Sequence, residues 1–248
     1  MLIVTGVDQS YKEGGLWTGT RRQVLSSIGF EWKQGECLGI IGESGSGKST
    51  LGRLLLGIER PDRGSILWEG RPITDRKARA GAISAVFQNY TSSINPFYTV
   101  EQALMEPLKL LRKNRREDNR SAIDRLLHQV GLDSSYRGRY VHELSGGEAQ
   151  RVCLARAVST EPRCIVLDEA LSSLDGSVQM QILELLKSLR TVYDTGYIFI
   201  THDIQAAVYL CDRVMIMRNG RIEEIVATGD LKETQSPYTR KLLEMILA

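Results

Sequence analysis

A glycine-rich stretch carries the clearest chemistry in this sequence. Residues 42–49 read GESGSGKS, which matches the pattern G-x-x-x-x-G-K-[ST]. Small residues in such a loop let successive backbone N–H groups converge on phosphate oxygens at the start of a helix. Lys48 adds positive charge for the outer phosphates, and the Ser49 hydroxyl is a ligand for Mg²⁺. The stretch therefore predicts binding of a phosphorylated nucleotide, against the alternative of a flexible Gly/Ser loop.

Acidic, amide and imidazole side chains that follow apolar runs supply the parts for hydrolysis. A nucleoside triphosphate is hydrolysed when Mg²⁺ is held, a water is oriented and the γ-phosphate charge is neutralised. Asp168 fits the acid that coordinates Mg²⁺, and Glu169 fits the group that polarises the attacking water. Gln88 fits a bridge between Mg²⁺ and that water, and His202 fits a hydrogen bond to the γ-phosphate. The alternative is a pair of loop carboxylates and a structural histidine, which the P-loop disfavours.

A second glycine pair opens another expected helix. Residues 144–151 read LSGGEAQR, in which Ser145 and Glu148 have the spacing of a capping box. Gly146 and Gly147 are poor helix formers, but they leave N–H groups unobstructed at the positive end of the helix, which suits an anion. Because the P-loop already supplies phosphate donors, this second site predicts contact with a phosphate held by another subunit.

Apolar strands must position these side chains. Strands are expected over residues 37–41, 84–87, 164–167 and 197–201, which lead to the P-loop, Gln88, Asp168 and His202. Continuous apolar strands separated by amphipathic helices predict a parallel sheet covered on both faces, with ligands at the carboxyl ends of its strands. The P-loop, Asp168, Glu169 and His202 are therefore expected at one edge. The helical stripes are Leu51, Leu54, Leu55 and Ile58; Val178, Ile182, Leu185, Leu186 and Leu189; and Ile204, Ala207, Val208 and Cys211.

The flanking segments have other patterns. Residues 2–7 and 65–70 read as strands of an antiparallel side sheet, with Tyr11 at a strand end before a loop over 14–22. In residues 89–139 the apolar strands are replaced by polar loops and helical periodicity, which indicates an inserted helical subdomain. A hairpin is expected around Asn219 and Gly220, and a last helix from Pro237 with Ser236 as its N-cap.

Bulk composition describes an ordinary globular protein. The 248 residues are 42% hydrophobic and 25% charged, with a net charge of +2, which argues against nucleic-acid binding. No apolar run reaches the ~18 residues that cross a bilayer, and the N-terminus lacks a signal-peptide pattern, so a cytoplasmic chain is expected. The four scattered cysteines predict reduced core thiols, and the mixed-sign run over 112–118 predicts a solvated helix end or loop.

Together, these motifs resemble the nucleotide-binding subunits of ABC transporters. The resemblance covers nearly the whole chain and rests on residues 42–49, Gln88, 144–148, 165–169, 172–175 and His202. It implies an α/β fold, a RecA-like P-loop NTPase core with an antiparallel β subdomain and an inserted α-helical subdomain. The implied parts are 1–88 (P-loop half of the core and β subdomain), 89–155 (helical subdomain with signature motif), 156–228 (second half of the core) and 229–248 (C-terminal helix).

The resemblance also implies a role for each site residue. Two such subunits close head to tail on two ATP molecules with Mg²⁺, each P-loop facing the partner's signature motif. The implied ATP contacts are Tyr11, stacked on adenine, and Gly42, Ser44, Gly45, Gly47, Lys48, Ser49 and Thr50; the Mg²⁺ ligands are Ser49, Gln88 and Asp168; the signature is Ser145, Gly146, Gly147 and Glu148; and Asp175 lies in a loop linking the sites. Glu148 stands where the family usually has Gln, and Ala170 where Pro is common. Because Glu148 adds negative charge near the partner's phosphate, a slightly weaker contact of the signature with that phosphate is expected.

A narrower resemblance is to the peptide/nickel importer branch. It rests on residues 86–88, 93–96, 106–108 and 236–240, while 150–157 and 168–170 look most like the second ATPase subunit of nickel importers, including systems for metal chelates. The implied function is the ATP-hydrolysing subunit of an importer for nickel or a metal chelate, with an oligopeptide or dipeptide importer as the alternative. The implied partners are a paralogous ATPase subunit, two permeases that contact the helical subdomain, and an extracytoplasmic binding protein, at the cytoplasmic face of the cell (inner) membrane and without nucleic acid.

Two other classes are less favoured. ABC proteins of DNA repair insert a long coiled coil between P-loop and signature, and those of translation carry two ATPase domains, neither of which this sequence contains. A regulatory, non-hydrolysing subunit is disfavoured because Lys48, Asp168, Glu169 and His202 are all present.

Overall fold

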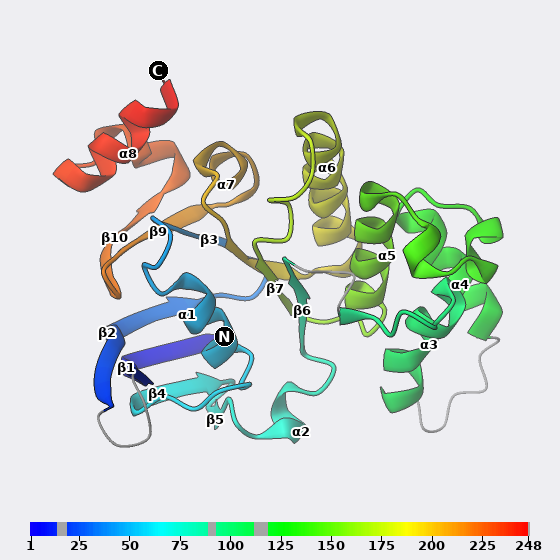
Figure 1. The fold of residues 1–248 in the computed structure, drawn as a ribbon, viewed down its shortest axis with the longest axis horizontal. Coiled ribbons are helices and arrows are strands. Elements are labelled where there is room, and N and C mark those ends of the chain that lie inside the picture. The colour runs from blue at the N-terminus through cyan, green and yellow to red at the C-terminus, as the bar shows by residue number, and fades with distance from the viewer. Residues whose placement is uncertain (14–18, 89–92, 112–118, 248) are drawn as a thin grey trace. The chain divides into compact units, whose positions relative to one another are not determined.

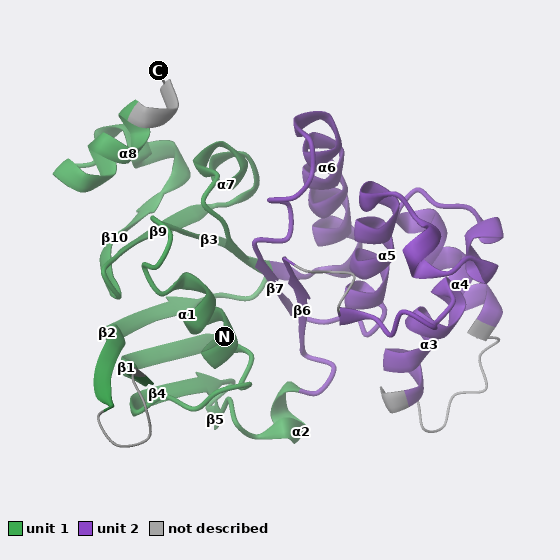
Figure 2. Cartoon of the chain, in the orientation of Figure 1, with its two compact units in different colours: residues 1–79, 197–248 green, residues 80–196 purple. Residues whose placement is uncertain are grey.

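The computed structural model describes residues 1–13, 19–88, 93–111 and 119–247 (Figure 1). The chain forms two compact units, unit 1 from residues 1–79 with 197–248 and unit 2 from residues 80–196 (Figure 2). The four parts expected from the sequence remain a prediction. Among the described residues, no helix combines the length and the apolar character needed to cross a bilayer.

Unit 1 contains two sheets. Its elements are β1 (Leu2–Glu13), β2 (Thr20–Trp32), β3 (Cys37–Ile41), α1 (Lys48–Leu55), β4 (Arg63–Trp68), β5 (Arg71–Pro72), α2 (Arg76–Arg79), β8 (Gly196–Ile200), α7 (Ile204–Leu210), β9 (Arg213–Arg218), β10 (Arg221–Ala227), the 3₁₀ helix η4 (Thr228–Glu233) and α8 (Pro237–Leu247).

The first sheet of unit 1 is antiparallel, with strand order β2-β1-β4-β5, and confirms the expected side sheet. Leu2 pairs with Trp32 on one side and with Trp68 on the other, and the two indole rings stack with centroids 5.8 Å apart. Both rings are fully buried. Aromatic stacking adds to the apolar burial that fixes this sheet.

The second sheet of unit 1 carries the P-loop. Strand β3 pairs in parallel with β8 on one side and β9 on the other, and β10 pairs antiparallel with β9. All five residues of β3 and of β8 are buried, as their continuous apolar sequences predict. Helix α7 packs on β3 and β9 and contacts α8. The core there contains Ile41, Ile204, Ala207, Val214, Ile216, Leu231, Tyr238 and Leu242.

Unit 2 contains two parallel strands and a group of helices. Its elements are β6 (Ile83–Phe87), α3 (Val100–Leu111), α4 (Asn119–Gln129), the 3₁₀ helices η2 (Ser134–Gly138) and η3 (Val141–Glu143), α5 (Gly146–Val158), β7 (Cys164–Asp168) and α6 (Gly176–Tyr193). Helix α5 contacts α3, α4, α6 and β6, and most of its side chains from Ala149 onward are buried. The run over 112–118 lies outside the described residues.

Three expectations were wrong in detail. Helix α1 ends at Leu55 because the chain turns at Gly57, whose φ is 62°, and Ile58 beyond it is 57% exposed. Val208 on α7 is 42% exposed, while Leu210 is buried in its place. Residues 20–22, expected in a loop, belong to β2, whereas 14–18 lie outside the described residues.

Three further expectations are confirmed. The four cysteines form no disulfide, and all four are buried. Asn219 and Gly220 both have positive φ, at 48° and 76°, as a type I′ turn requires. Helix α8 starts at Pro237, and the Ser236 hydroxyl accepts a hydrogen bond from Thr239 N.

Candidate functional site

The glycine-rich loop of unit 1 is shaped by contacts with distant strands. Gly42 has a φ of 153°, and a Cβ there would lie 2.2 Å from the carbonyl oxygen of Met217 on β9. Gly47 has a φ of 102°, and its Cβ would lie 2.6 Å from a methyl group of Leu25 on β2. A larger residue at either position would strain the backbone and clash. Packing against β9 and β2 therefore requires both glycines.

The turn of the β9–β10 hairpin braces the same loop. Gly220 N donates to the carbonyl oxygen of Ser46 at 3.1 Å, and the carbonyl oxygen of Gly220 accepts from Ser26 N at 2.8 Å. The turn thus links the P-loop to β2 through two backbone hydrogen bonds. Such bracing limits rearrangement of the loop on ligand binding, which favours a preformed phosphate site.

The start of α1 is the positive end of the site. Gly47 is the N-cap residue and gives no side-chain cap, and the first turn carries no acidic residue. Lys48 is 6% exposed, and its Nζ donates to the carbonyl oxygens of Gly42 at 2.7 Å and of Glu43 at 2.9 Å. A buried ammonium group is tolerated when hydrogen bonds satisfy it. The helix dipole and Lys48 together favour an anion here.

The other predicted loop residues lie on either side of this point. Ser44 and Gly45 are exposed on the loop, Ser49 is half-buried and Thr50 is buried in the first turn of α1. The Thr50 hydroxyl accepts a hydrogen bond from Arg53 Nη2 at 3.1 Å. The predicted P-loop contacts with phosphate therefore occupy one continuous segment of unit 1.

His202 follows the strand next to the P-loop strand. Ile40 of β3 pairs with Ile200 of β8, and Thr201 N donates to the carbonyl oxygen of Ile40 at 3.1 Å. The two strands are parallel, so both carboxyl ends lie at the same edge. The expectation that His202 and the P-loop share an edge is confirmed. His202 itself is exposed.

Tyr11 lies within β1, two residues before the strand ends, and is partly buried. Its hydroxyl donates to the carboxylate of Glu59 and accepts from Arg53 Nη2 at 3.2 Å. Neither partner is indicated by a sequence pattern, because both lie more than 40 positions from Tyr11 and their types are common on helix surfaces.

Gln88 and the acidic pair follow the two strands of unit 2. Strands β6 and β7 are parallel, and Phe87 pairs with Asp168. Gln88 and Glu169 each come directly after these paired residues, so the three predicted side chains gather at one strand edge. Asp168 is 9% exposed and Gln88 is exposed. The expected approach of Asp168 and Glu169 to the P-loop, which belongs to the other unit, remains a prediction.

Glu169 has an unusual backbone. Its φ is 50°, in the left-handed region that non-glycine residues seldom adopt. The carbonyl oxygen of Glu169 accepts hydrogen bonds from Ser172 N at 3.3 Å and from the Ser172 hydroxyl at 2.9 Å. Strained backbone of this kind is concentrated at functional sites, where the surrounding structure stabilises it. The conformation is a second reason to assign Glu169 a chemical role.

The signature stretch begins helix α5 of unit 2. The Ser145 hydroxyl accepts from Glu148 N at 3.4 Å, and the Glu148 carboxylate accepts from Ser145 N at 2.8 Å, so the predicted capping box is present. Gly146 is exposed at the first helical position. A Cβ on Gly147 would lie 2.9 Å from Val178 on α6, so this position needs a glycine for close packing.

Glu148 has an additional partner. The Tyr136 hydroxyl of η2 donates to its carboxylate at 2.5 Å, and the Arg139 guanidinium lies 4.4 Å from the centre of the Tyr136 ring. The hydrogen bonds from Tyr136 and then from Ser145 hold the pKa of Glu148 below its usual value. The carboxylate is therefore ionised and engaged by its own subunit.

Asp175 is the N-cap of α6. Its carboxylate accepts from Val178 N at 3.0 Å and from Ser177 N at 3.1 Å, and these bonds lower its pKa. The side chain is thus held in the orientation that starts the helix. This local role is compatible with the role in linking two sites that the family resemblance implies.

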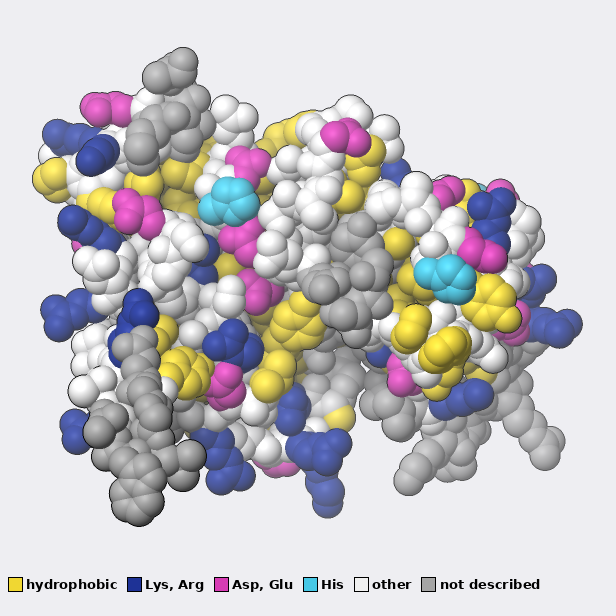
Figure 3. All heavy atoms as spheres, in the orientation of Figure 1, with side chains coloured by type: hydrophobic (Ala, Val, Ile, Leu, Met, Phe, Trp, Pro, Cys, Tyr) yellow, Lys and Arg dark blue, Asp and Glu magenta, His cyan; other side chains and the backbone are white. Residues whose placement is uncertain are grey.

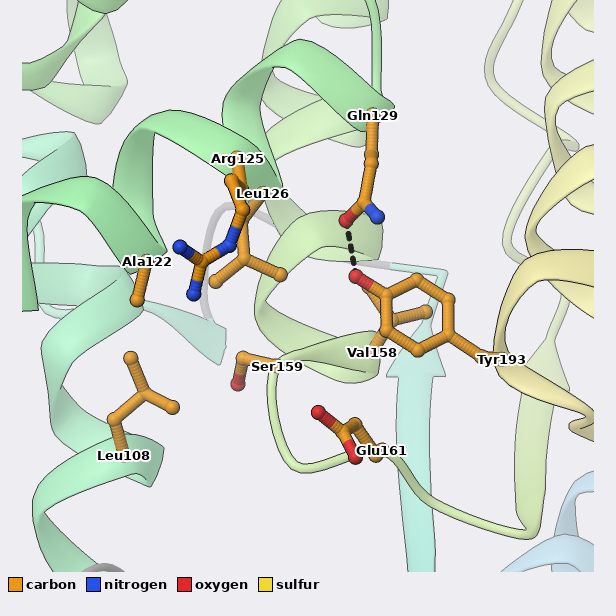
Figure 4. A pocket seen from close by; sticks show the side chains of 9 residues that line it. All are labelled: Leu108, Ala122, Arg125, Leu126, Gln129, Val158, Ser159, Glu161 and Tyr193. Atoms are coloured by element: carbon orange, nitrogen blue, oxygen red, sulfur yellow. Dashed lines mark hydrogen bonds between the residues drawn. The ribbon is translucent and has the colours of Figure 1, made fainter. Parts of the chain in front are cut away.

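A separate pocket in unit 2 lies apart from these residues. It holds about 130 Å³, and its lining includes Leu108, Gln129 and Tyr193 (Figure 4). The Tyr193 hydroxyl donates to Gln129 Oε1 across it. None of the predicted site residues lines this pocket.

Comparisons with known proteins agree with this geometry. The family model described as "ABC transporter" matches residues 25–172. The chain is 46% identical over 248 residues to the metal-staphylopine import system ATP-binding protein CntF of Staphylococcus aureus (strain Mu50), with 100% of both chains covered. It is 38% identical over 253 residues to the nickel import ATP-binding protein NikE of Escherichia coli (strain K12), covering 100% of this chain and 94% of that protein.

One solved structure with the same fold holds hydrolysis products. It is the ATP-binding cassette MJ0796, described as a dimer in a post-hydrolysis state bound to ADP and Pi. The two folds superpose with a TM-score of 0.82 at 26% identity, covering 92% of this chain and 99% of that one.

Proposed function

The chain belongs to the ABC transporter family, whose ATP-binding subunits hydrolyse ATP to drive transport, and from this premise we propose that it powers import of nickel or of a metal chelate. The observation that supports this cargo is the 46% identity to the metal-staphylopine import ATPase along the full length of both chains. An ATPase subunit need not contact its cargo, so the cargo is assigned through the relatives described above.

We propose a division of chemical roles between the two units. In unit 1, the N–H groups of the P-loop and Lys48 hold the outer phosphates, Tyr11 stacks on adenine and His202 donates to the γ-phosphate. In unit 2, Glu169 accepts hydrogen-bond donation from the attacking water and orients it. The left-handed φ of 50° at Glu169 supports this role, because it sets the direction in which the side chain leaves the backbone after β7.

The proposed Mg²⁺ ligands fit the ion. The Ser49 hydroxyl, the Gln88 side-chain oxygen and the Asp168 carboxylate are all hard oxygen donors, which Mg²⁺ prefers. Asp168 is the last residue of β7 and pairs with Phe87 of β6, and Gln88 directly follows Phe87. When bound, Mg²⁺ supplies charge neutralisation for the phosphate oxygens.

The proposed assembly contains a second, related ATPase subunit. Ser145 and Gly147 of this chain would donate to the γ-phosphate on the partner's P-loop, while Asp175 joins the two composite sites. The proposed assembly further contains two membrane permeases and an extracytoplasmic binding protein, and the ATPase pair lies at the cytoplasmic face of the membrane.

An apolar surface on unit 2 is the proposed permease contact. Phe97 is 83% exposed and Tyr140 is 42% exposed, and the Tyr140 ring stacks on His142 with centroids 5.4 Å apart. Val100 N donates to the carbonyl oxygen of Arg139 at 2.9 Å, which joins the two segments. A groove of about 750 Å³ along α3 is lined by Tyr98, Thr99, Glu101, Gln102, Met105, Glu106 and Lys109. Figure 3 shows hydrophobic side chains gathered over this part of unit 2. Exposed apolar patches of this kind mark interaction sites.

Uptake and hydrolysis test the proposal together. Cells lacking this chain should fail to accumulate ⁶³Ni or a ⁶³Ni chelate but should import labelled dipeptides normally, and the intact chain should restore metal uptake. Glu169→Gln should lower ATP turnover by about 100- to 10,000-fold, because the general base is lost, while ATP binding is retained. Loss of peptide uptake with normal metal uptake would overturn the cargo, and unchanged turnover in E169Q would overturn the role of Glu169.

A further inference from the structure

A hydrogen-bonded network joins the two ends of the proposed nucleotide site in unit 1. Arg53, on the outer face of α1, donates through Nη2 to the Thr50 hydroxyl at 3.1 Å and to the Tyr11 hydroxyl at 3.2 Å. Its Nε donates to Glu59 Oε1 at 2.6 Å. Thr50 belongs to the predicted phosphate contacts, and Tyr11 is the predicted adenine contact. Arg53 therefore connects a residue of the phosphate end to a residue of the base end.

The Tyr11 hydroxyl is held from two directions. It donates to Glu59 Oε2 and accepts from Arg53, so it forms one bond in each role. Two partners on one phenol oxygen restrict the torsion angles that aim the ring, whereas packing alone leaves the ring free to tilt. Burial alone would raise the pKa of Glu59, but the hydrogen bonds from Tyr11 and Arg53 outweigh it and lower that pKa. The carboxylate is thus ionised and available as an acceptor.

The segment after α1 places Glu59 in reach. Gly57 has a φ of 62°, and a Cβ there would lie 2.7 Å from the carbonyl oxygen of Ile73. The carbonyl oxygen of Arg53 accepts from Ile58 N at 3.0 Å and from Glu59 N at 3.4 Å, which folds the turn back over Arg53. The turn that ends α1 early is therefore the feature that completes the network.

We propose that Arg53 and Glu59 are positioning residues that orient the Tyr11 ring for the base of a purine nucleotide, so that base recognition is coupled to the P-loop helix. The inference rests on the proposed function, because it takes the adenine contact of Tyr11 from there. It adds two residues that contact neither phosphate nor base.

The neighbouring residues on the same strand supply a matched control. Ser10 N and the Ser10 hydroxyl donate to Asp62 Oδ2 at 2.8 and 2.6 Å, and Arg21 Nη2 donates to Asp62 Oδ1 at 3.1 Å. This ion pair ties the same segment to β1 and β2 but has no bond to Tyr11. Asp62→Asn removes one carboxylate charge from the same turn, as Glu59→Gln does.

The test compares a ligand with a base and a ligand without one. Equilibrium dissociation constants of the full chain are measured for ATP·Mg²⁺ and for inorganic tripolyphosphate·Mg²⁺. We expect Glu59→Gln and Tyr11→Phe each to weaken ATP binding by roughly 3- to 10-fold, which is less than the effect of losing a stacked aromatic ring. Binding of tripolyphosphate should be unchanged in both variants. Asp62→Asn should leave both constants unchanged. The double variant should be no weaker than the stronger single variant, because both changes break one network.

The outcomes separate the network from the function on which it rests. If wild-type chain binds ATP and Lys48→Ala does not, but E59Q and Y11F bind ATP as tightly as wild type, the network is refuted while the proposed nucleotide site stands. An equal loss of ATP and tripolyphosphate binding in E59Q refutes it also, since that result indicates general damage to unit 1. If the wild-type chain fails to bind ATP, the proposed function itself is refuted. Y11F carries the test should E59Q fold poorly, as judged by urea denaturation.

Discussion

Two helix N-termini in this molecule are proposed to face phosphate, and they are built in opposite ways. Helix α1 begins at Gly47, which has no side chain to cap it, and its first turn contains the buried cation Lys48. Helix α5 begins at Ser145, which caps it, and its first turn contains the anion Glu148. One start is arranged for an external anion, and the other uses its own side chains to satisfy its first N–H groups.

In the proposed composite site, this difference gives the two helix starts different roles. A helix start that lacks a side-chain cap gains most from binding phosphate, so α1 is suited to capture nucleotide by itself. A capped start with a nearby carboxylate gains less, so α5 is suited to join a phosphate that is already held. Binding and closure are then separate steps, each assigned to one helix start.

Changing the α1 start should have the largest effect. Gly47→Ala forces a φ of 102° on a residue with a Cβ and brings that Cβ within 2.6 Å of Leu25. Strain and overpacking each cost about 1–3 kcal/mol, so we expect ATP affinity to fall by about 100-fold or more and the free energy of unfolding to drop. Isothermal titration with ATP·Mg²⁺ and urea denaturation measure the two effects.

Gly229→Ala is the control for this change. Gly229 also lies in unit 1, but its φ is not in the left-handed region and nothing lies within 4 Å of a Cβ built there. It should bind ATP like wild type. Wild-type affinity in G47A would mean that the close contacts with β2 do not shape the phosphate site.

The α5 cap should have an intermediate effect that depends on assembly. Ser145→Ala removes the N-cap oxygen, which costs about 1 kcal/mol of stability. We expect the isolated chain to bind ATP as before, because its own phosphates sit on α1, while turnover by the assembled transporter falls. Ser145→Thr keeps the hydroxyl and should retain most turnover. Weaker ATP binding by the isolated S145A chain would contradict the division between the two helix starts.

The charge at Glu148 should have the smallest effect. Glu148→Gln keeps a capping residue at this position, so we expect the free energy of unfolding at pH 7 to change by only a few tenths of a kcal/mol. The folded-state pKa of Glu148 is lowered, so its contribution to stability is present above the unfolded pKa of about 4.3 and is lost as the pH falls through the folded pKa.

Urea denaturation from pH 7 down to pH 3 reveals this contribution. The difference in unfolding free energy between wild type and E148Q should shrink as the pH falls below about 4.3. Tyr136→Phe, which removes the main donor to Glu148, should reduce the same pH dependence. A constant difference across this range would mean that Glu148 gains nothing from its partners in the folded chain.

Much of the fold follows from local patterns in the sequence. Strand β3 and the Asn219–Gly220 turn were predictable because continuous apolar runs and paired positive-φ residues are local signals. Strand β2 was missed because its first half is polar and exposed, and only its pairing with β1 makes it a strand. The end of α1 was missed because Ile58 continues the helical stripe in sequence, although Gly57 has already turned the chain.

The same distinction between local and distant information applies to the candidate site. The P-loop, the acidic pair and the capping box are contiguous motifs, so their residue types and spacing define them. The partners Arg53, Glu59 and Tyr136 act through side-chain hydrogen bonds to segments that are far apart or irregular. Nothing in their identity marks those contacts, so only the folded structure reveals them.

The hydrogen bond between Gly220 and Ser46 also sets an order of events during biosynthesis. A ribosome releases the P-loop early, but the amide that braces it is made more than 170 residues later. The strands β8 and β9 that flank β3 are also made late. A growing chain folds from its N-terminus, so the β1–β2 pair is free to form first. The nascent protein therefore completes the bracing of its P-loop only after the β9–β10 hairpin has left the ribosome.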